Sequence, residues 1–465
     1  MAHFLVIGGG IGGMATALLA ARHGHTAEVF EQAERAPGAD LDGDFFGWHR
    51  PGVPQANQPH VLLGAARTLL RTELPDVYAE MLRLGARERH ELDWFEERPP
   101  ARPGDDDLVM VQARRIVLES ALASALRAEP RVTRHFGTPV TGLLTRPAAG
   151  AQPPRVTGVR TADGRSEGDL VVDTAGRRGA VDRWLAESGC RPGRTEQHRT
   201  GIAYFGRWYR LPGGTLDGPA RPWSVAGGSF AGCAVFPSDN GMFAVTLFVH
   251  TSDPTRAALR DPAVFEAAAR TFAPGAAWLA LGAEPLSDVL AMAGLDNRWS
   301  APADERGPVA SGLVPVGDAL THTNPTLAQG VSLALWAARR VAATAHEDPG
   351  GARFAAGYRA WAVRTLRPWF DLQVAADDST GDRLASRAAR TGAARESAAL
   401  FDCALDDPEV MRVRARVRHL AESPERAYAD PAVRRRVADW LAARPGYVPN
   451  QAGPDRDEWE KITAR

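Results

Sequence analysis

Lysine is almost absent from this chain of 465 residues: its 55 basic residues are arginines except for Lys461, close to the C-terminal end. A Schiff-base or pyridoxal-phosphate enzyme needs a lysine positioned within the body of the fold, and so does a Walker-type phosphate-binding loop. The near-absence of lysine therefore argues against all three classes. The bias towards arginine is typical of a GC-rich genome.

Cysteine and long apolar runs are also scarce. Cys190, Cys233 and Cys403 form an odd set without CxxC spacing, which argues against a disulfide framework or a zinc site and favours buried, reduced thiols. No apolar run reaches the roughly 18 residues that span a bilayer. The first residues, MAHFLVIGGGIGG, lack the basic segment and cleavage site of a signal peptide. We therefore expect a cytoplasmic protein with no membrane span and no metal.

A surplus of one charge is missing as well, because 55 Lys and Arg residues face 56 Asp and Glu residues, for a net charge of −1. Nothing in this balance favours nucleic acid or an anionic membrane as a partner. Hydrophobic residues make up 44% and charged residues 24%, as in folded globular proteins. The length exceeds the roughly 250–300 residues at which single cores stop growing, which predicts two or three domains.

The N-terminus carries a dinucleotide-binding pattern. An apolar strand over 3–7 ends in glycines, a helix over 15–23 follows, and a second strand over 27–30 ends at Glu31. Gly8 would make the tight turn, Gly10 would admit a pyrophosphate close to the backbone, and Gly13 would allow close helix–strand packing. Glu31 is placed to bind a ribose diol. The contacts predicted from this unit are Gly8, Gly10, Ile11, Gly12, Gly13, Glu31 and Gln32.

The rest of the chain predicts an α/β fold interrupted by a β-rich insert. Residues 36–60 look irregular, whereas 61–71, 77–84 and 115–127 look helical, and alternation near 140 and 156 indicates a hairpin. From about residue 198 the pattern changes to period two, with a turn signal at 238–241. A strand over 312–318, a long helix over 326–346 and a helical, arginine-rich tail follow. We expect a Rossmann-like domain (1–190 and 299–346), a mostly antiparallel substrate domain (191–298) and a helical C-terminal region (347–465).

Three further segments resemble those of a known family. They are Arg115-x-x-Leu-x-x-x-Leu preceded by Gln112, the run GDLVVDTAGRR over 168–178, and the run GDALTHTNPTLAQG over 317–330. Together with the N-terminal glycines they resemble the FAD-dependent monooxygenases of the p-hydroxybenzoate hydroxylase fold over about residues 3–340. The likeness is strongest to the branch with polyether-type epoxidases and natural-product oxygenases. Ala175 stands where the family has aspartate, and Ala328 where it has glycine.

The resemblance implies FAD as the cofactor and assigns further residues to it. Asp318 would bind the ribitol, and Pro325 would precede a helix whose positive N-terminal end faces the flavin pyrimidine and stabilises negative charge on the reduced ring. The arginine at the start of the 115–127 helix would contact the dinucleotide, and Arg114 competes with Arg115 for this role. The further cofactor residues are Arg115, Val140, Gly176, Gly317, Asp318, Pro325, Ala328, Gln329 and Gly330.

The activity that the resemblance implies is oxygenation. NADPH or NADH and O2 would act through a flavin C4a-hydroperoxide to hydroxylate or epoxidise a hydrophobic or aromatic intermediate of secondary-metabolite or antibiotic biosynthesis. Ala175 lies in a loop linked to NAD(P)H in the family, so an FAD oxidase or dehydrogenase, or a two-component oxygenase with a separate reductase, stays open. A flavin-dependent halogenase is disfavoured, because those enzymes use a lysine near the flavin. A protein that only sequesters a ligand is a further alternative.

Candidate residues for the chemistry come from the 50–60 loop, the 317–330 segment and the insert. Arg50 would offset negative charge on the flavin, and His60 would donate a hydrogen bond to substrate or peroxide. His322 lies near the flavin by its place in the motif. Aromatic residues of the insert would wall a dry substrate cavity, and those we select are Tyr204, Trp208 and Phe236. A monomer and a homodimer both stay open.

Overall fold

A five-stranded parallel sheet forms the centre of the computed structural model, which describes residues 1–50, 52–148, 152–214, 218–219, 224–346, 348–385 and 392–464. Its strand order is β21-β10-β1-β2-β6, and every neighbouring pair is parallel. Each strand is short and apolar, as a sheet covered on both faces requires. The strands are β1 (His3–Ile7), β2 (Thr26–Phe30), β6 (Val132–His135), β10 (Leu170–Asp173) and β21 (Leu313–Pro315).

One face of this sheet is covered by α1 (Ile11–Arg22), which packs between α5 (Arg115–Ala128) and α9 (Gly330–Thr344). Almost the whole of α1 is buried, because neighbouring helices and the sheet surround it. The long helix expected from residue 326 instead begins at Gly330, after a separate 3-10 turn at Pro325–Leu327. The predicted βαβ unit is confirmed, whereas the start of the later helix was placed four residues too early.

Two small sheets flank the parallel one. In the first, β5 (Val109–Gln112) lies between β3 (Val61–Leu62) and β4 (Arg87–His90); in the second, β8 (Arg155–Arg160) lies between β7 (Gly142–Arg146) and β9 (Arg165–Glu167). The hairpin expected near 140 and 156 is therefore confirmed as β7–β8. The helix expected from Val61 begins at Gly64 (α3, Gly64–Glu73) and is followed by α4 (Pro75–Arg83).

The segment 36–60 is not wholly irregular, contrary to our expectation. It contains α2 (Leu41–Gly47), whose N-terminus is capped by Asp40: the Asp40 carboxylate accepts from the Gly43 N–H at 2.9 Å. Leu41 and Phe45 bury the inner side of this short helix. The pattern was missed because a helix of two turns gives little periodicity.

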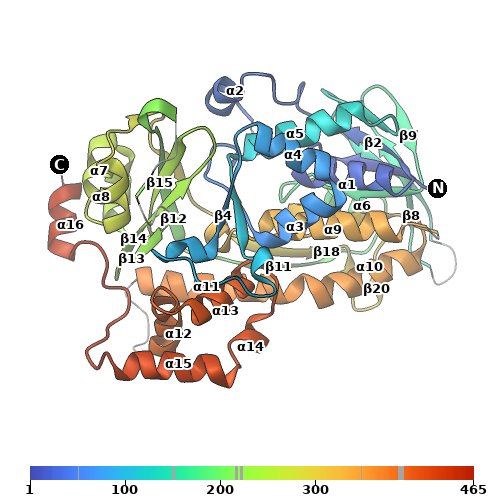
Figure 1. Ribbon diagram of the computed structural model, residues 1–465. Coiled ribbons are helices and arrows are strands. Elements are labelled where there is room, and N and C mark those ends of the chain that lie inside the picture. The colour runs from blue at the N-terminus through green and yellow to red at the C-terminus, as the bar shows by residue number, and fades with distance from the viewer. Residues whose placement is uncertain are drawn as a thin grey trace.

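The insert is a mostly antiparallel sheet, as predicted, with strand order β13-β14-β15-β12-β16 and β17 paired to β12. The β14–β15 hairpin turns at residues 238–241, where Asn240 and Gly241 have φ of 54° and 70°, the left-handed pair that a tight hairpin needs. Helices α7 (Pro262–Ala269) and α8 (Ala273–Leu279) pack on its outer face (Figure 1). The strands are β12 (Ile202–Arg210), β13 (Ser224–Gly227), β14 (Ala231–Pro237), β15 (Met242–His250), β16 (Glu284–Pro285) and β17 (Leu290–Met292).

A three-stranded sheet of β11 (Arg194–His198), β18 (Asn297–Ala301) and β22 (Thr321–His322) joins the insert to the Rossmann-like part. The tail is helical as predicted, and it returns along the underside of the molecule (Figure 1). Its last helix, α16 (Arg456–Thr463), packs against α7 of the insert. The other tail helices are α10 (Ala352–Thr365), α11 (Arg367–Leu384), α12 (Gly392–Cys403), α13 (Pro408–Arg418), α14 (Pro424–Ala427) and α15 (Pro431–Ala442).

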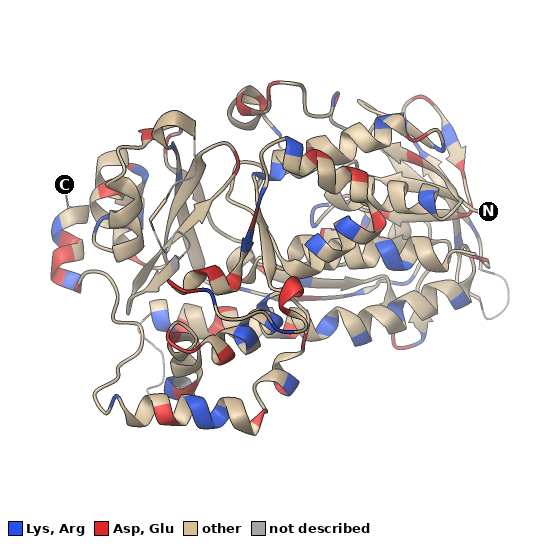
Figure 2. Cartoon of the chain, viewed as in Figure 1, with Lys and Arg blue, Asp and Glu red and all other residues tan. Residues whose placement is uncertain are grey.

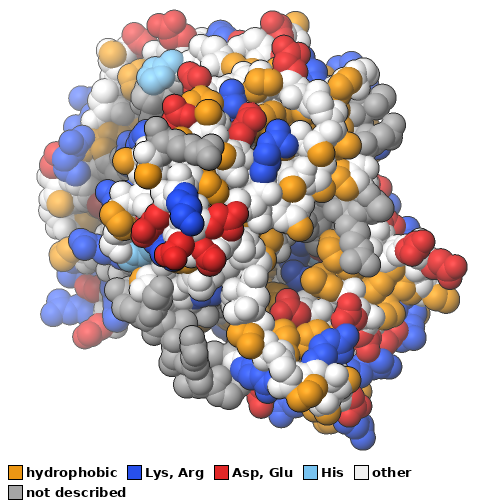
Figure 3. All heavy atoms as spheres, turned by 90° about the vertical axis from the view of Figure 1, so that its left-hand side faces the viewer, with side chains coloured by type: hydrophobic (Ala, Val, Ile, Leu, Met, Phe, Trp, Pro, Cys, Tyr) orange, Lys and Arg blue, Asp and Glu red, His pale blue; other side chains and the backbone are white. Residues whose placement is uncertain are grey.

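Charged side chains of both signs are mixed over the surface helices, whereas the insert strands carry few of them (Figure 2). On the face drawn in Figure 3, acidic and basic side chains lie next to one another. The three cysteines are buried, unpaired thiols, as expected. Within the described ranges, no helix is long and apolar enough to cross a membrane.

Candidate active site

A cavity of about 3130 Å³ lies where the parallel sheet, the insert and the tail meet. The N-terminal glycine loop, the ends of β2, β10 and β21 and the first turn of α9 form one side of it. Strands β12, β14, β15 and β17 supply another side, and α11, α12 and α13 a third. The carboxyl ends of parallel strands converge here, which is where doubly wound sheets bind their ligands.

The glycine loop is shaped for close approach by a ligand. Gly8 has φ of 103°, and a Cβ on it would lie 2.9 Å from the Thr174 carbonyl oxygen; one on Gly13 would lie 1.9 Å from the Gly8 carbonyl oxygen. A Cβ on Gly10 would instead meet only the Arg115 guanidinium, at 3.9 Å. Helix α1 begins after Gly10 without a side-chain cap, so its first N–H groups are available to an anion. The loop fits a dinucleotide pyrophosphate.

Glu31 holds this loop in place. Its carboxylate accepts from the Gly9 N–H at 2.5 Å and from the Ala33 N–H at 2.7 Å, and the residue also lines the cavity. Each carboxylate oxygen has a second lone pair, so Glu31 can bind a ribose diol while it positions the loop. Gln32 and Val140 line the same part of the cavity.

The two competing arginines have different surroundings. Arg114 is fully buried outside the cavity, where its guanidinium pairs with Asp239 at 2.6 Å and with Asp42 at 2.7 Å. Arg115 lines the cavity, and its Nε donates to Glu119 at 2.9 Å. Arg50 binds the other oxygen of Glu119. Of the two, Arg115 is therefore the arginine that can reach a cofactor.

Arg50 lies at the cavity wall, beside the predicted cofactor site. In addition to its ion pair with Glu119, its guanidinium stacks over the ring of Trp48, at 4.4 Å from the ring centroid. Arg35 lies over the same ring at 4.5 Å. Arg50 thus keeps a cation at the cavity while one buried carboxylate and one aromatic ring fix its position.

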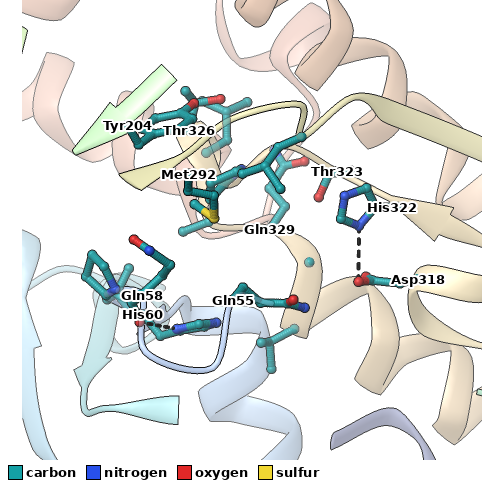
Figure 4. Close-up of a pocket in the computed structure, with 18 of the residues that line it drawn as sticks. Gln55, Gln58, His60, Tyr204, Met292, Asp318, His322, Thr323, Thr326 and Gln329 are labelled. Carbon is teal, nitrogen blue, oxygen red and sulfur yellow. Dashed lines mark hydrogen bonds and ion pairs between the residues drawn. The ribbon is translucent and has the colours of Figure 1, made fainter. Parts of the chain in front are cut away.

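Asp318 and His322 lie side by side after β21 (Figure 4), with the His322 Nδ1 3.1 Å from Asp318 Oδ2, which is ion-pair distance for a protonated imidazole. Burial raises the pKa of the Asp318 carboxyl, but the hydrogen bond and charge of His322, together with Arg115 and Arg177, outweigh that effect and leave the pKa below its ordinary value. Asp318 is ionised at neutral pH and can accept from a hydroxyl. His322 contacts Asp318, so this geometry suits it to positioning the carboxylate.

Ala328 occupies a left-handed backbone conformation, with φ of 56°. The turn Pro325–Leu327 closes there through the Ala328 N–H, which donates to the Pro325 carbonyl at 2.9 Å. The conformation explains why glycine is usual at this position. Helix α9 then starts at Gly330 without a side-chain cap, with its first turn at the cavity. Its N–H groups can stabilise negative charge.

His60 faces the insert across the cavity (Figure 4). Its Nδ1 lies 2.8 Å from the Gln58 carbonyl oxygen, which must accept, so Nδ1 carries the proton. Burial and the charge of Arg115 lower the His60 pKa to about 4. The ring is therefore neutral at pH 7 and its Nε2 is an acceptor, which replaces the donor role that we expected.

The three aromatic residues of the insert have different positions. Tyr204 and Phe236 line the cavity, and the Tyr204 hydroxyl bonds to the Asn324 side chain at 2.8–3.0 Å. Trp208 does not line it: the residue is 1% exposed, its Nε1 donates to the Asn57 carbonyl at 2.7 Å, and its ring packs edge-on against Phe45. Trp208 shares the strand face of Tyr204 but lies beyond the cavity, where α2 and the following loop cover it.

A buried polar network joins the tail to the candidate cofactor site, and our sequence analysis did not predict it. Asp377 of α11 is fully buried and accepts from Asn297 at 2.8 Å, Asn324 at 2.9 Å, Thr326 at 2.5 Å and Gln373 at 2.9 Å. The tail carries no known motif. The one available signal was the polar pair Gln373 and Asp377, four residues apart on one helix face.

This arrangement is the fold of the FAD-dependent monooxygenases of the p-hydroxybenzoate hydroxylase type: a parallel Rossmann-like sheet with a β-rich insert across the carboxyl ends of its strands. A sequence model of the NAD(P)-binding Rossmann-like domain matches residues 6–71. Among curated proteins, the chain is 26% identical over 367 residues to Protein Rv3254 of Mycobacterium tuberculosis (strain ATCC 25618 / H37Rv), covering 71% of this chain and 70% of that protein.

Solved structures share the fold at low sequence identity. PqsL, a probable FAD-dependent monooxygenase from Pseudomonas aeruginosa, is 20% identical with a TM-score of 0.61, covering 82% of this chain and 97% of PqsL. The flavin-dependent brominase Bmp2 is 15% identical with a TM-score of 0.59 and coverages of 95% and 100%. A mutant of 2-methyl-3-hydroxypyridine-5-carboxylic acid oxygenase is 16% identical with a TM-score of 0.56 and coverages of 85% and 96%.

Proposed function

We propose that this protein is an FAD-dependent monooxygenase that uses NADPH or NADH and O2 to hydroxylate or epoxidise a hydrophobic or aromatic natural-product intermediate. One observation carries the proposal: a single cavity brings together the glycine loop, Arg115, Asp318 and the first turn of α9, and the insert walls the same cavity. Each of these groups suits one part of an FAD molecule. When bound, FAD would accept electrons from NADPH or NADH and, once reduced, activate O2.

The residues would divide the binding of FAD along the cavity. Gly10 and the first turn of α1 would bind the pyrophosphate, Glu31 the adenosine ribose, and Asp318 the ribitol. Arg115 would contact the dinucleotide from α5. The first turn of α9, after Ala328, would stabilise negative charge at the pyrimidine edge of the ring.

The chemistry left to the protein is the handling of protons and water. Neutral His60, with Nε2 as an acceptor, can accept a hydrogen bond from a substrate hydroxyl, and its lowered pKa makes it a weak base that does not donate through Nε2. Arg50 would favour negative charge near the ring. Phe236, Phe248 and Met292 give the insert side an apolar surface, which excludes water from the reacting groups.

Purified holoprotein supplied with NADPH or NADH, candidate substrates and isotopically labelled O2 tests the proposal. A product that contains one labelled oxygen atom is the expected result, read by mass spectrometry. Reduced nucleotide that is consumed without any labelled product from a broad panel of aromatic and alkene substrates would contradict oxygenation.

A second candidate is an FAD oxidase or dehydrogenase, or a two-component oxygenase, and Ala175 favours it. The residue is exposed in the loop after β10, and no carboxylate stands at that position. Rapid mixing of oxidised holoprotein with NADPH or NADH without oxygen separates the candidates. Direct bleaching of the flavin absorbance supports a single-component monooxygenase, whereas an unchanged spectrum supports a separate electron donor. Halogenation is disfavoured in spite of the structural likeness to Bmp2, because Lys461, the one lysine of the chain, lies on α16 and does not line the cavity.

A further inference from the structure

One wall of the cavity is a single face of α11. Leu372, Ala375, Ala376, Ser379, Thr380 and Arg383 line the cavity from this helix. Their spacing of three and four places them on one side of a helix. Between Leu372 and Arg383 the side chains are small, so this wall is flat and ends in a cation.

The two ends of this face lie at different parts of the cavity. Near its start, Gln373 and Asp377 bond to Thr326, which places the first half of α11 against the turn that leads into α9. At the other end, the guanidinium of Arg383 lies beside Gly227 of β13 and donates to the Gly228 carbonyl. The rise of an α-helix puts about 16 Å between the backbones of Leu372 and Arg383.

Arg383 has no carboxylate partner within ion-pair distance in the part of the chain that the structure describes, although burial lowers its pKa to about 10. By contrast, Arg367 on the same helix pairs with Glu196 at 2.8 Å and with Asp371 at 2.7 Å. A partly buried cation that has a carbonyl but no carboxylate as its partner gains from an anion that joins it. Arg383 lines the cavity, so an anionic ligand has access to it.

The insert strands that pack beside α11 give the cavity an apolar and partly aromatic surface, with Tyr204, Phe236, Phe248 and Met292. This surface and the small side chains of α11 together suit aromatic rings. Aromatic rings also offer the apolar contact area that both walls can bury.

We propose that the substrate is an elongated, flat anion: aromatic rings that lie along α11, with a carboxylate or acidic hydroxyl bound to Arg383 at the end remote from the Pro325 turn. This rests on the proposed function in one respect, because the end near the Pro325 turn is the one that would be oxygenated. The binding geometry itself does not depend on turnover. Arg383 would thus set both the charge and the length of the accepted substrate.

The test compares anthracene-2-carboxylate with its neutral carboxamide, using the FAD-loaded protein and the fluorescence of the anthracene ring to measure Kd. We expect the acid to bind about 10- to 100-fold more tightly than the amide, as one charge-assisted bond to an arginine provides. Arg383→Met should abolish this preference and leave amide binding unchanged. Arg364→Met, which removes an exposed arginine on α10, is the matched control and should change neither value.

A second pair of measurements tests length and shape. Ala376→Phe should weaken binding of anthracene-2-carboxylate and leave that of benzoate unchanged, because benzoate does not extend along the helix. Equal Kd values for acid and amide on the unaltered protein would overturn the proposal without recourse to any variant, and so would a failure of the unaltered protein to bind either. Normal acid preference, together with no labelled product from the whole substrate panel, would leave this inference standing and contradict the proposed function instead.

Discussion

Gly10 and Gly13 belong to one motif, but different features of the structure require glycine at the two positions. The Gly13 position leaves no room for a Cβ, since one would lie 1.9 Å from the Gly8 carbonyl oxygen, whereas the Gly10 position is open towards the cavity. The Gly10 position therefore leaves room for a ligand, whereas Gly13 is required by the packing of the chain. The sequence motif contains glycine at both positions and does not distinguish these two roles.

Gly10→Val should leave the fold intact and abolish FAD retention, because its methyl groups would occupy the space of the pyrophosphate. Gly13→Val should prevent folding. Circular dichroism reports the fold, and the flavin absorbance of the purified protein reports the cofactor. Yellow, folded Gly10→Val protein would refute the assignment.

Asp318→Ala should loosen the flavin ring while the glycine loop and Glu31 still bind the adenine half. We expect the amount of oxygenated product per NAD(P)H consumed to fall, because water reaches a poorly held site. The ratio of product to hydrogen peroxide measures this coupling. If the melting temperature falls and the coupling stays the same, Asp318 is a structural residue.

The raised pKa of the Asp173 carboxyl predicts that the free energy of unfolding depends on pH. Burial raises its pKa to about 7, above the ordinary value of 3.8, and the Ala175 N–H donates to it at 3.0 Å. A raised carboxyl pKa gives stability that is complete below about pH 4 and is lost as the pH rises through 7. Asp173→Asn should therefore raise the free energy of unfolding by about 1–3 kcal/mol at pH 8 and leave it nearly unchanged at pH 4. Urea unfolding at both pH values checks this, and equal effects would contradict it.

At the scale of elements, the segment between β21 and α9 contains a motif that the sequence predicts and a strained backbone conformation, at Ala328, that it does not predict. The residues from Gly317 to Gly330 were recognisable because they are contiguous and their spacing has no gap. The start of α9 was not recognisable from the sequence. A residue in the left-handed conformation separates the 3-10 turn from the helix, and such a residue does not change the hydrophobic pattern. Ala328 has that conformation without the freedom of glycine.

Ala328→Gly should stabilise the protein by about 0.5–1 kcal/mol. A left-handed backbone costs alanine about 1 kcal/mol or more, and glycine removes this strain, but its greater conformational entropy in the unfolded chain offsets part of the gain. Thermal unfolding of the cofactor-free protein measures the change. Ala338→Gly, in the buried middle of α9, is the control and should destabilise instead. A lower melting temperature for Ala328→Gly would contradict the strain.

Contacts distant in sequence mark the limit of what the chain alone predicts. The alternating pattern of β12 predicted a strand with aromatic side chains on both faces, but it gave no information on where along the strand the cavity ends. The tail was predicted as helical from composition and breaks, yet its place beside the cavity depends on Asp377, which bonds residues 51 to 80 positions away as well as Gln373. Such pairings leave no local signature.

At the scale of the molecule, one buried ion pair connects the Rossmann-like part to the insert. Arg114, at the start of α5, meets Asp239 in the β14–β15 turn, and both side chains are 0% exposed. A buried charge that loses its partner costs about 3–5 kcal/mol, whereas an apolar replacement of both partners is often neutral.

Arg114→Met should therefore destabilise the protein by about 3–5 kcal/mol, and Asp239→Leu by a similar amount. The double variant should recover much of that loss. A double-mutant cycle on urea unfolding measures the coupling. Strictly additive losses would show that the pair does not couple the two parts.

The order of strands in the parallel sheet also bears on how the protein is made. Residues 3–30 build two of its inner strands, but the outer strand β21 and the helix beside α1 come from residues 313–344. Asp377, which holds the turn between them, is synthesised later still. During translation the first glycine loop thus leaves the ribosome long before its partner segments exist. The glycine loop, the turn before α9 and Asp377 can come together only after residues up to 377 have left the ribosome, so the part of the site made first stays open for most of that time.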